Sequence, residues 1–205
     1  QGVPAEINAD AHASIVDIFN ETVTKYAHRP AFANLGHQLS YAELAKASRA
    51  FASYLQNDCG LAKGARVAIM LPNVLQYPIA LFGILQAGMT VVNVNPLYTS
   101  HELEHQLKDS GAEAIIVLAN FAHVVERALP KTQIKTVIVT ELGDCFPTLK
   151  RWLTNVFVKH VKKLVPAWKI AQARRFRDCL GRGRQETFKP VKIAPEDLAF
   201  LQYTG

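Results

Sequence analysis

The chain has 205 residues, of which 49% are hydrophobic and 20% are charged. This composition is ordinary for a globular protein with a buried core, and it excludes a disordered or fibrous chain. The net charge of +6 indicates an anionic partner or surface. Net charge does not indicate the fold.

The cysteines and the apolar runs narrow the class of protein further. Cys59, Cys145 and Cys179 are widely spaced and form no C-x-x-C or metal-binding pattern, which fits a reducing cytoplasm. The longest apolar run, residues 79–85, is far below the roughly 18 residues that a membrane-spanning helix needs. We therefore expect neither a signal peptide nor a transmembrane helix, and a cytoplasmic location.

Two helices separated by a hairpin come first along the chain. Residues 14–26 have apolar side chains at helical spacing, and we expect the stripe that faces the core to be Ile15, Ile18, Phe19, Thr22 and Tyr26. Residues 31–41 predict a hairpin that turns at Gly36-His37. Residues 41–57 predict a second long helix with an inward face of Leu44, Ser48, Phe51, Ala52 and Leu55.

Four short runs rich in β-branched residues follow, and they begin 22 to 24 residues apart, at 67–71, 90–94, 114–118 and 136–140. Helical patterns separate them at 74–87, 101–110 and 121–129. This alternation predicts parallel strands joined by crossover helices. Because the runs show no polar alternation, both faces of the sheet should be covered. The sequence thus predicts an α/β fold, a parallel sheet with crossover helices on both faces.

Polar residues follow the second of these runs, at a strand end where open α/β sheets place ligands. They are Asn93, Asn95, Pro96 and Tyr98, and they fit either a structural turn or one wall of a substrate site. Thr99-Ser100 predicts a helix N-cap, with Glu102 in the first turn and Gly111 as the stop.

His101 and His105 are spaced by one helical turn, as two ligands of a metal ion can be. Glu102 and Glu104 beside them fit a solvated polar face equally well, and no third ligand is evident. We predict no metal site in this chain.

A basic window spans residues 150–184, with eleven Lys and Arg and a single acid, Asp178. Within it, residues Leu149 to Val165 place apolar and cationic side chains on opposite helical faces, and Pro166 ends the pattern. Such a helix either covers the core with a solvated basic face or lies in the plane of an anionic membrane surface. Nucleic acid is not predicted as a partner, because the window has no recognisable binding motif.

The last residues, 195–205, read as an apolar strand that runs into Tyr203-Thr204-Gly205. A strand that ends in Thr-Gly is the usual beginning of a phosphate-binding loop. We divide the chain into N-terminal helices and hairpin (3–60), a βα-repeat core (61–145), a basic amphipathic insert (146–190) and the strand leading into this loop (191–205).

Four segments together resemble the AMP-forming acyl-adenylate enzymes, and most closely the bacterial long-chain fatty acyl-CoA synthetases. They are residues 39–55 with Leu39-Ser-Tyr-Ala-Glu-Leu44, residues 64–73 with Met70-Leu-Pro-Asn73, residues 80–99 with Asn93-Val-Asn-Pro-Leu-Tyr98, and residues 195–205. Gln76-Tyr77-Pro78 also points to the long-chain type.

The resemblance implies a ligase that uses ATP and Mg to convert a long-chain fatty acid to acyl-AMP and then transfers the acyl group to coenzyme A. Tyr203, Thr204 and Gly205 would begin its ATP loop. The family's catalytic residues lie beyond this loop, so we expect none in this chain, and we expect the chain by itself to be inactive.

Two other functions remain open from the sequence. One is an adenylate-forming ligase for a different carboxylic acid, such as an aryl acid, and the other is a non-catalytic membrane-surface or interaction module. We further expect exposed apolar surface, self-association into a homo-oligomer, and peripheral contact of residues 149–165 with the inner face of the cell membrane.

Overall fold

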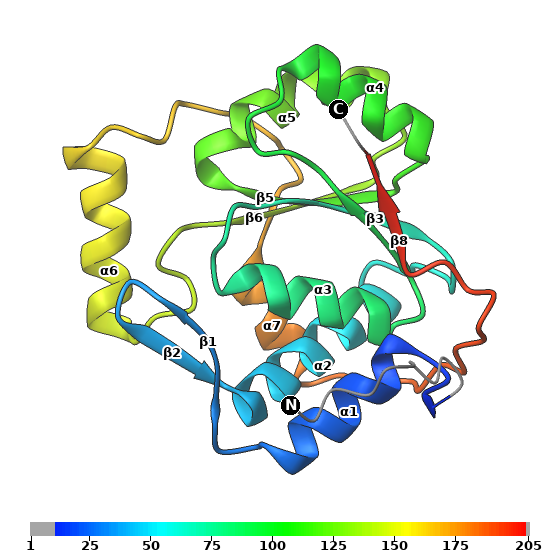
Figure 1. Cartoon of the computed structure of the whole chain (residues 1–205). Helices are drawn as coiled ribbons and strands as arrows, with labels where there is room; N and C mark the ends of the chain where they lie inside the picture. The colour runs from blue at the N-terminus through cyan, green and yellow to red at the C-terminus, as the bar shows by residue number, and fades with distance from the viewer. Residues whose placement is uncertain (1–10, 204–205) are drawn as a thin grey trace, which may run out of the picture.

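The computed structural model describes residues 11–203, which are built around one six-stranded parallel sheet (Figure 1). The strand order is β7-β6-β5-β3-β4-β8. The strands are β3 (Arg66–Met70), β4 (Thr90–Asn93), β5 (Ala114–Leu118), β6 (Thr136–Thr140), β7 (Arg174–Arg175) and β8 (Phe200–Gln202). Every neighbouring pair in this sheet is parallel, as the spacing of the apolar runs predicts.

Helices cover both faces of the sheet. In Figure 1, α4 (Ser100–Ser110) and α5 (Ala122–Ala128) lie above it, while α1 (Ile15–Lys25), α2 (Tyr41–Asn57), α3 (Gln76–Gln86) and α7 (Phe176–Gly183) lie below. Alternate strand residues accordingly enter two separate cores, with Val67 and Ile69 below and Ala68 and Met70 above. The predicted α/β fold with helices on both faces is confirmed.

The first helix packs on a narrower stripe than its sequence predicts. Ser14 caps α1, and Phe19 is its buried residue, stacked on Phe82 with ring centroids 4.0 Å apart. Ile15 and Ile18, predicted to face inward, are 41% and 45% exposed. The contacts come from Val16 and Val23 instead, because residues 16, 19 and 23 form the row that meets α2 and α3.

The hairpin of β1 (Pro30–Asn34) and β2 (His37–Ser40) turns one residue earlier than predicted. Asn34 pairs with His37, so the two-residue loop is Leu35-Gly36 rather than Gly36-His37. Both loop residues have positive φ, 46° and 69°, as the hairpin turn with matching twist requires. Leucine rarely adopts this conformation, which is why the sequence did not mark it.

The long helix α2 lies where the sequence predicts it and forms the centre of the lower layer. Ser40 and Glu43 make a capping box, and the predicted inward residues Leu44, Ser48, Phe51, Ala52 and Leu55 are all buried. Its packing against α3 and α7 depends on two glycines. A Cβ at Gly83 would lie 2.9 Å from the Phe51 ring, and one at Gly183 would lie 1.9 Å from the carbonyl oxygen of Ala50.

The upper layer begins with the predicted cap. Thr99 and Glu102 form a capping box at the start of α4, and Gly111, with φ 62°, ends the helix in the left-handed region. Helix α5 is shorter than predicted because short 3₁₀ turns, η2 (Ala119–Phe121) and η3 (Leu129–Lys131), stand at its two ends.

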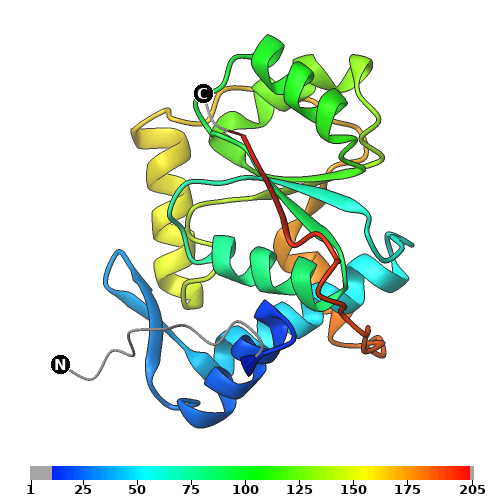
Figure 2. The same ribbon diagram turned by 45° about the vertical axis from the view of Figure 1, so that its right-hand side comes forward.

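Helix α6 (Thr148–Val156) stands at the side of the sheet, with the hairpin near its lower end (Figures 1 and 2). It continues as a π-helical turn, η4 (Phe157–Val161), and ends there rather than near Val165. Lys163, with φ 52°, reverses the chain, and the Leu164 N–H donates to the carbonyl of Val158. Neither α6 nor η4 has a buried residue.

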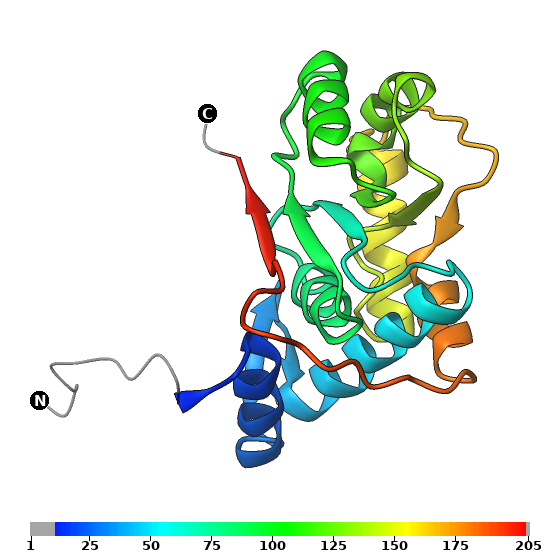
Figure 3. The same ribbon diagram turned by 90° about the vertical axis from the view of Figure 1, so that its right-hand side faces the viewer.

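Residues 184–199 carry the chain from one edge of the sheet to the other (Figure 3). They pass α2, where the Gln56 side chain bonds the backbone of Lys189 in both directions. Thus β7 and α7, at one edge, are followed by β8 at the opposite edge. No helix within residues 11–203 has the length and apolar character needed to cross a membrane.

Candidate functional site

The strand β8 is paired with β4, and Tyr203, the first residue of the predicted phosphate loop, directly follows it. Val91, Val92 and Asn93 pair with Phe200, Leu201 and Gln202. The pairing is extended by the Thr90 hydroxyl, which donates to the Leu198 carbonyl at 2.9 Å, and by the Val91 N–H, which donates to the Ala199 carbonyl at 2.9 Å. The register of β8 is therefore fixed along its whole length, up to the residue before Tyr203.

Asn93, the last residue of β4, joins three elements through hydrogen bonds. The Tyr77 hydroxyl of α3 donates to its Oδ1 at 2.9 Å, and its Nδ2 donates to Oε1 of Gln202 on β8 at 2.9 Å. Its backbone carbonyl accepts from Nε2 of Gln106 on α4 at 2.7 Å. Asn93 therefore connects both helical layers to the end of β8.

Two members of this network have polar atoms in apolar surroundings. Burial raises the pKa of the Tyr77 phenol, although the bond to Asn93 opposes the shift. Gln106 is 2% exposed, and its Oε1 has no partner among the described residues. A buried amide oxygen without a hydrogen-bond donor destabilises the fold. Among the described residues, the Gln106 Oε1 is therefore a free acceptor beside the end of β4.

Tyr203 is the one predicted loop residue that the structure describes. Its ring packs against the upper core, and its hydroxyl donates to the Asp109 carboxylate of α4 at 2.5 Å. Burial, and then Asp109, raise the pKa of the phenol to about 12. The Tyr203 side chain thus anchors the end of β8 to α4. Thr204 and Gly205, the other two predicted site residues, lie outside the described residues, and their role stays a prediction.

The residues after β4 form a turn. The Asn95 side chain accepts from the Leu97 N–H at 3.0 Å, and the Tyr98 N–H donates to the Asn95 carbonyl at 3.1 Å. These contacts support the structural interpretation for Asn95, whereas Asn93 belongs to the strand-end network. His101 and His105 are exposed on α4, and no group of three His, Cys, Asp or Glu that could hold a metal ion occurs in residues 11–203.

Four residues of this site were not identified from the sequence, namely Tyr77, Gln106, Asp109 and Gln202. Tyr77 did carry a signal, since Gln76-Tyr77-Pro78 contributes to the family resemblance. The other three are ordinary polar residues in their own segments. They are brought to the strand end by contacts between residues up to 109 positions apart, which a single sequence does not reveal.

What the arrangement can do chemically follows from its geometry. A parallel strand presents its following loop at the carboxyl edge of the sheet, where α/β folds bind ligands. The contacts described above involve neutral amides and hydroxyls, together with the Asp109 carboxylate. These groups can hold the end of β8 in place.

Comparison with known proteins agrees with this geometry. The family of AMP-binding enzymes matches residues 19–205. The chain is 54% identical over 203 residues to a long-chain-fatty-acid–CoA ligase of Escherichia coli O157:H7, covering 99% of this chain and 36% of that protein. It is 33% identical to the long-chain-fatty-acid–CoA ligase of Bacillus subtilis, over 94% of this chain and 34% of that protein.

Solved structures share the fold. The crystal structure of a long-chain-fatty-acid-CoA ligase from Archaeoglobus fulgidus superposes with a TM-score of 0.68 at 23% identity, over 94% of this chain and 34% of that one. The anthranilate CoA ligase AuaEII gives a TM-score of 0.75 at 17% identity, over 97% of this chain and 34% of that one. The chain spans about a third of the length of these relatives, and it belongs to the AMP-binding enzyme family.

Proposed function

We propose that this chain is the first part of a ligase that activates long-chain fatty acids with ATP and passes the acyl group to coenzyme A. The observation that carries the proposal is the similarity to long-chain-fatty-acid–CoA ligases over almost the whole chain. The fixed end of β8 supports it, because Tyr203, the first residue of the predicted loop, directly follows an edge strand whose register on β4 is set by backbone pairing and by the Asn93–Gln202 bond.

In the proposed reaction, a carboxylate oxygen of the fatty acid attacks the α-phosphorus of ATP and pyrophosphate leaves. The thiol of coenzyme A then attacks the acyl carbon, and AMP leaves. The role of this chain is positional: Asn93 and Gln202 fix β8, and the Tyr203 side chain anchors the end of β8 to α4. The Thr204 hydroxyl and the Gly205 N–H would be the first phosphate donors.

Magnesium would neutralise phosphate charge in this reaction. The family resemblance implies that its ligands come from other parts of the ligase. The division into four segments, 3–60, 61–145, 146–190 and 191–205, likewise remains part of the proposal.

The test of the proposed substrate is a panel of acids given to the longer ligase that contains this chain. With ATP, Mg and coenzyme A, we expect acyl-CoA from dodecanoate, palmitate and oleate, and little product from benzoate or anthranilate. The reverse preference would support the ligase for an aryl acid. Absence of any acyl-CoA with every acid would support the non-catalytic module.

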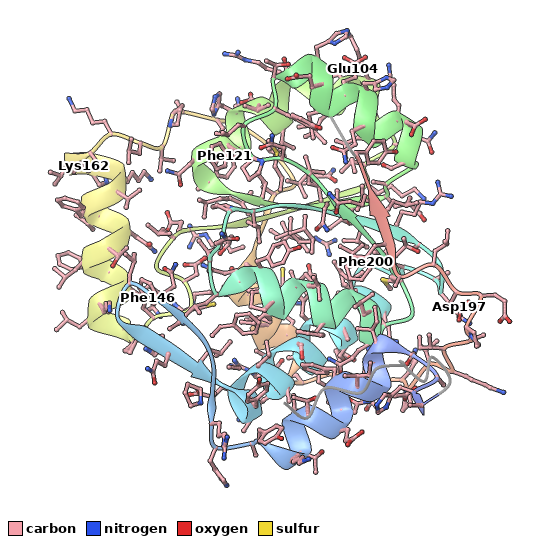
Figure 4. All side chains as sticks on the ribbon, viewed as in Figure 1. Glu104, Phe121, Phe146, Lys162, Asp197 and Phe200 are labelled. Carbon is pink, nitrogen blue, oxygen red and sulfur yellow. The ribbon has the colours of Figure 1, made fainter. Side chains whose placement is uncertain are left out.

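We also propose a role for α6 and η4, whose apolar side chains face solvent. Leu149 is 72% exposed, Trp152 60%, Leu153 52%, Phe157 47% and Val161 63%. Lysines accompany them, and Lys162 stands at the far end of this helix in Figure 4. We propose that α6 and η4 contact an anionic membrane surface from the cytoplasmic side, where such a helix would lie close to the fatty acid supply.

Vesicle co-sedimentation of the 205-residue chain tests this contact. Each lysine near an anionic surface contributes only about 1 kcal/mol and is screened by salt. Lys162→Gln with Lys163→Gln should weaken binding to phosphatidylglycerol vesicles and flatten its salt dependence. Leu153→Ser with Phe157→Ser should weaken binding at every salt concentration. A wild-type chain that ignores anionic vesicles would contradict the proposal.

A further inference from the structure

A large groove lies between α6 with η4 on one side and residues 165–178 on the other, beside β6 and β7. Its volume is about 1430 Å³, larger than the roughly 300–1,000 Å³ of ordinary small-molecule pockets. The apolar part of its lining includes Val139, Leu149, Trp152, Val156, Val165 and Trp168. This groove is separate from the strand end that carries Asn93 and Tyr203.

The groove is also cationic. Five basic side chains line it, Arg151, Lys159, Arg174, Arg175 and Arg177, against three acids. Two of the acids are already engaged: Glu141 accepts from the Asn155 amide at 2.9 Å, and Asp144 accepts from the Thr140 hydroxyl at 2.9 Å. Asp178 is the third acid.

The basic side chains are largely free to meet an anion. None of the five forms an ion pair with another described residue. Arg174 donates to the Tyr54 hydroxyl at 2.7 Å and is therefore occupied. Lys159, Arg175 and Arg177 are exposed at the groove, so a ligand carboxylate placed among them would gain charge-assisted hydrogen bonds.

Apolar walls and unpaired cations together select an amphiphilic anion. We propose that this groove binds one long-chain fatty acid, with its carboxylate near Lys159, Arg175 and Arg177 and its alkyl chain along Trp152, Val156 and Trp168. The inference rests on the proposed function for the choice of this anion, and it adds a binding site outside the ATP-loop region. Volume alone does not limit the chain length, because the groove exceeds ordinary ligand pockets.

The groove is continuous with the exposed face of α6. Leu149 and Trp152 belong to its lining and are also 72% and 60% exposed. A fatty acid at a lipid surface touching α6 would therefore meet the groove without crossing bulk water. The carboxylate end would stay near solvent, where the exposed cations lie, and the alkyl chain would leave water, which is the main source of affinity.

Intrinsic fluorescence reports on this site, because both tryptophans of the chain, Trp152 and Trp168, line the groove. The probe is a brominated long-chain fatty acid, kept below its micelle concentration, since bromine quenches indole only on close contact. We expect saturable quenching of the 205-residue chain. Binding should tighten with chain length by up to about fourfold for each buried CH₂.

Matched variants separate the site from general charge. Lys159→Gln, Arg175→Gln and Arg177→Gln together should weaken binding at least tenfold. Lys162→Gln, Lys169→Gln and Arg184→Gln remove the same charge from the same basic window but lie outside the groove lining, and they should change binding less than twofold. Val156→Gln should weaken binding of long acids more than of octanoate. Circular dichroism melts confirm that each variant is folded.

Three outcomes would overturn the proposal. They are no quenching by the brominated acid, an equal loss of affinity in the two triple charge variants, and an affinity that does not depend on the length of the fatty acid. Quenching by vesicles of brominated phospholipid but not by the monomeric acid would assign the tryptophans to membrane contact instead. Quenching that appears only as the chain self-associates, followed by light scattering, would assign the face to a second copy. The two proposals fail in different experiments. If the proposed function is wrong, the acid panel yields no acyl-CoA. If the groove proposal is wrong, the binding assay, which contains neither ATP nor coenzyme A, shows no fatty acid binding.

Discussion

Asn93 and Gln202 are register partners on neighbouring parallel strands, and the Asn93 side-chain amide donates to the Gln202 amide oxygen at 2.9 Å. The same Asn93 side chain accepts from Tyr77. Asn93 thus joins α3, near the start of the βα core, to β8, the last described strand.

Replacing Asn93 by Ala should therefore loosen the end of β8. We expect the free energy of unfolding of the 205-residue chain to fall by about 2 kcal/mol, because two side-chain hydrogen bonds of about 1 kcal/mol each are lost. In the longer ligase, kcat/KM for ATP should fall as well. Asn34→Ala is the control, since it removes one exposed bond to the Asn73 carbonyl, far from β8. Equal effects of the two substitutions in urea unfolding and in ATP kinetics would contradict this role of Asn93.

The close packing of α7 on α2 gives a second prediction within one helix. A Cβ at Gly183 would overlap the Ala50 carbonyl, whereas a Cβ at Gly181 meets nothing within 4 Å. We expect Gly183→Ala to destabilise the chain by about 1–3 kcal/mol through overpacking. Gly181→Ala should stabilise it by about 0.5–1 kcal/mol, since alanine is the better helix former. Thermal melts that rank the two variants in the opposite order would show that α7 packs differently.

Only part of this fold could be predicted from the sequence. Local signals were sufficient for α2, for the Thr99–Glu102 cap and for the four central strands, because periodicity and capping act within a few residues. Local signals failed for the inward row of α1, because two apolar stripes of this helix were possible and tertiary contacts select between them. They also failed for the end of α6, because the helix changes there to a π-helical turn.

The site was predicted only in outline. The sequence marked Asn93 and Tyr203 by their positions at strand ends. Gln106, Asp109 and Gln202 were missed, since their importance comes from pairing between distant segments. The groove beside α6 was missed for the same reason, although the basic window that supplies its cations was evident.

The exposure of α6 predicts that its aromatic residues contribute little to folding. Trp152→Ala with Phe157→Ala should change the free energy of unfolding by less than about 1 kcal/mol, because both side chains are about half exposed or more. Guanidinium unfolding of the 205-residue chain, followed by circular dichroism, measures this. A loss of several kcal/mol would mean that the two side chains are core residues after all.

The Tyr203–Asp109 contact predicts a dependence on alkaline pH. The pKa of Tyr203 is raised from its ordinary value of 10 to about 12 in the folded chain. The folded state therefore keeps the proton when the unfolded state loses it, so this contribution is present below pH 10 and is lost as the pH rises through about 12. Tyr203→Phe removes it. In urea unfolding, the stability difference between wild type and Tyr203→Phe should shrink between these two pH values; a difference that grows would contradict the bond to Asp109.

The most direct test of the proposed function is the exchange of labelled pyrophosphate into ATP by the longer ligase that contains this chain, because exchange isolates the adenylation step from the transfer to coenzyme A. We expect exchange that requires Mg and a long-chain acid such as palmitate or oleate, and that falls when Asn93 is replaced by Ala. No exchange with any acid from dodecanoate to oleate, together with rapid exchange with an aryl acid, would contradict the activation of long-chain fatty acids.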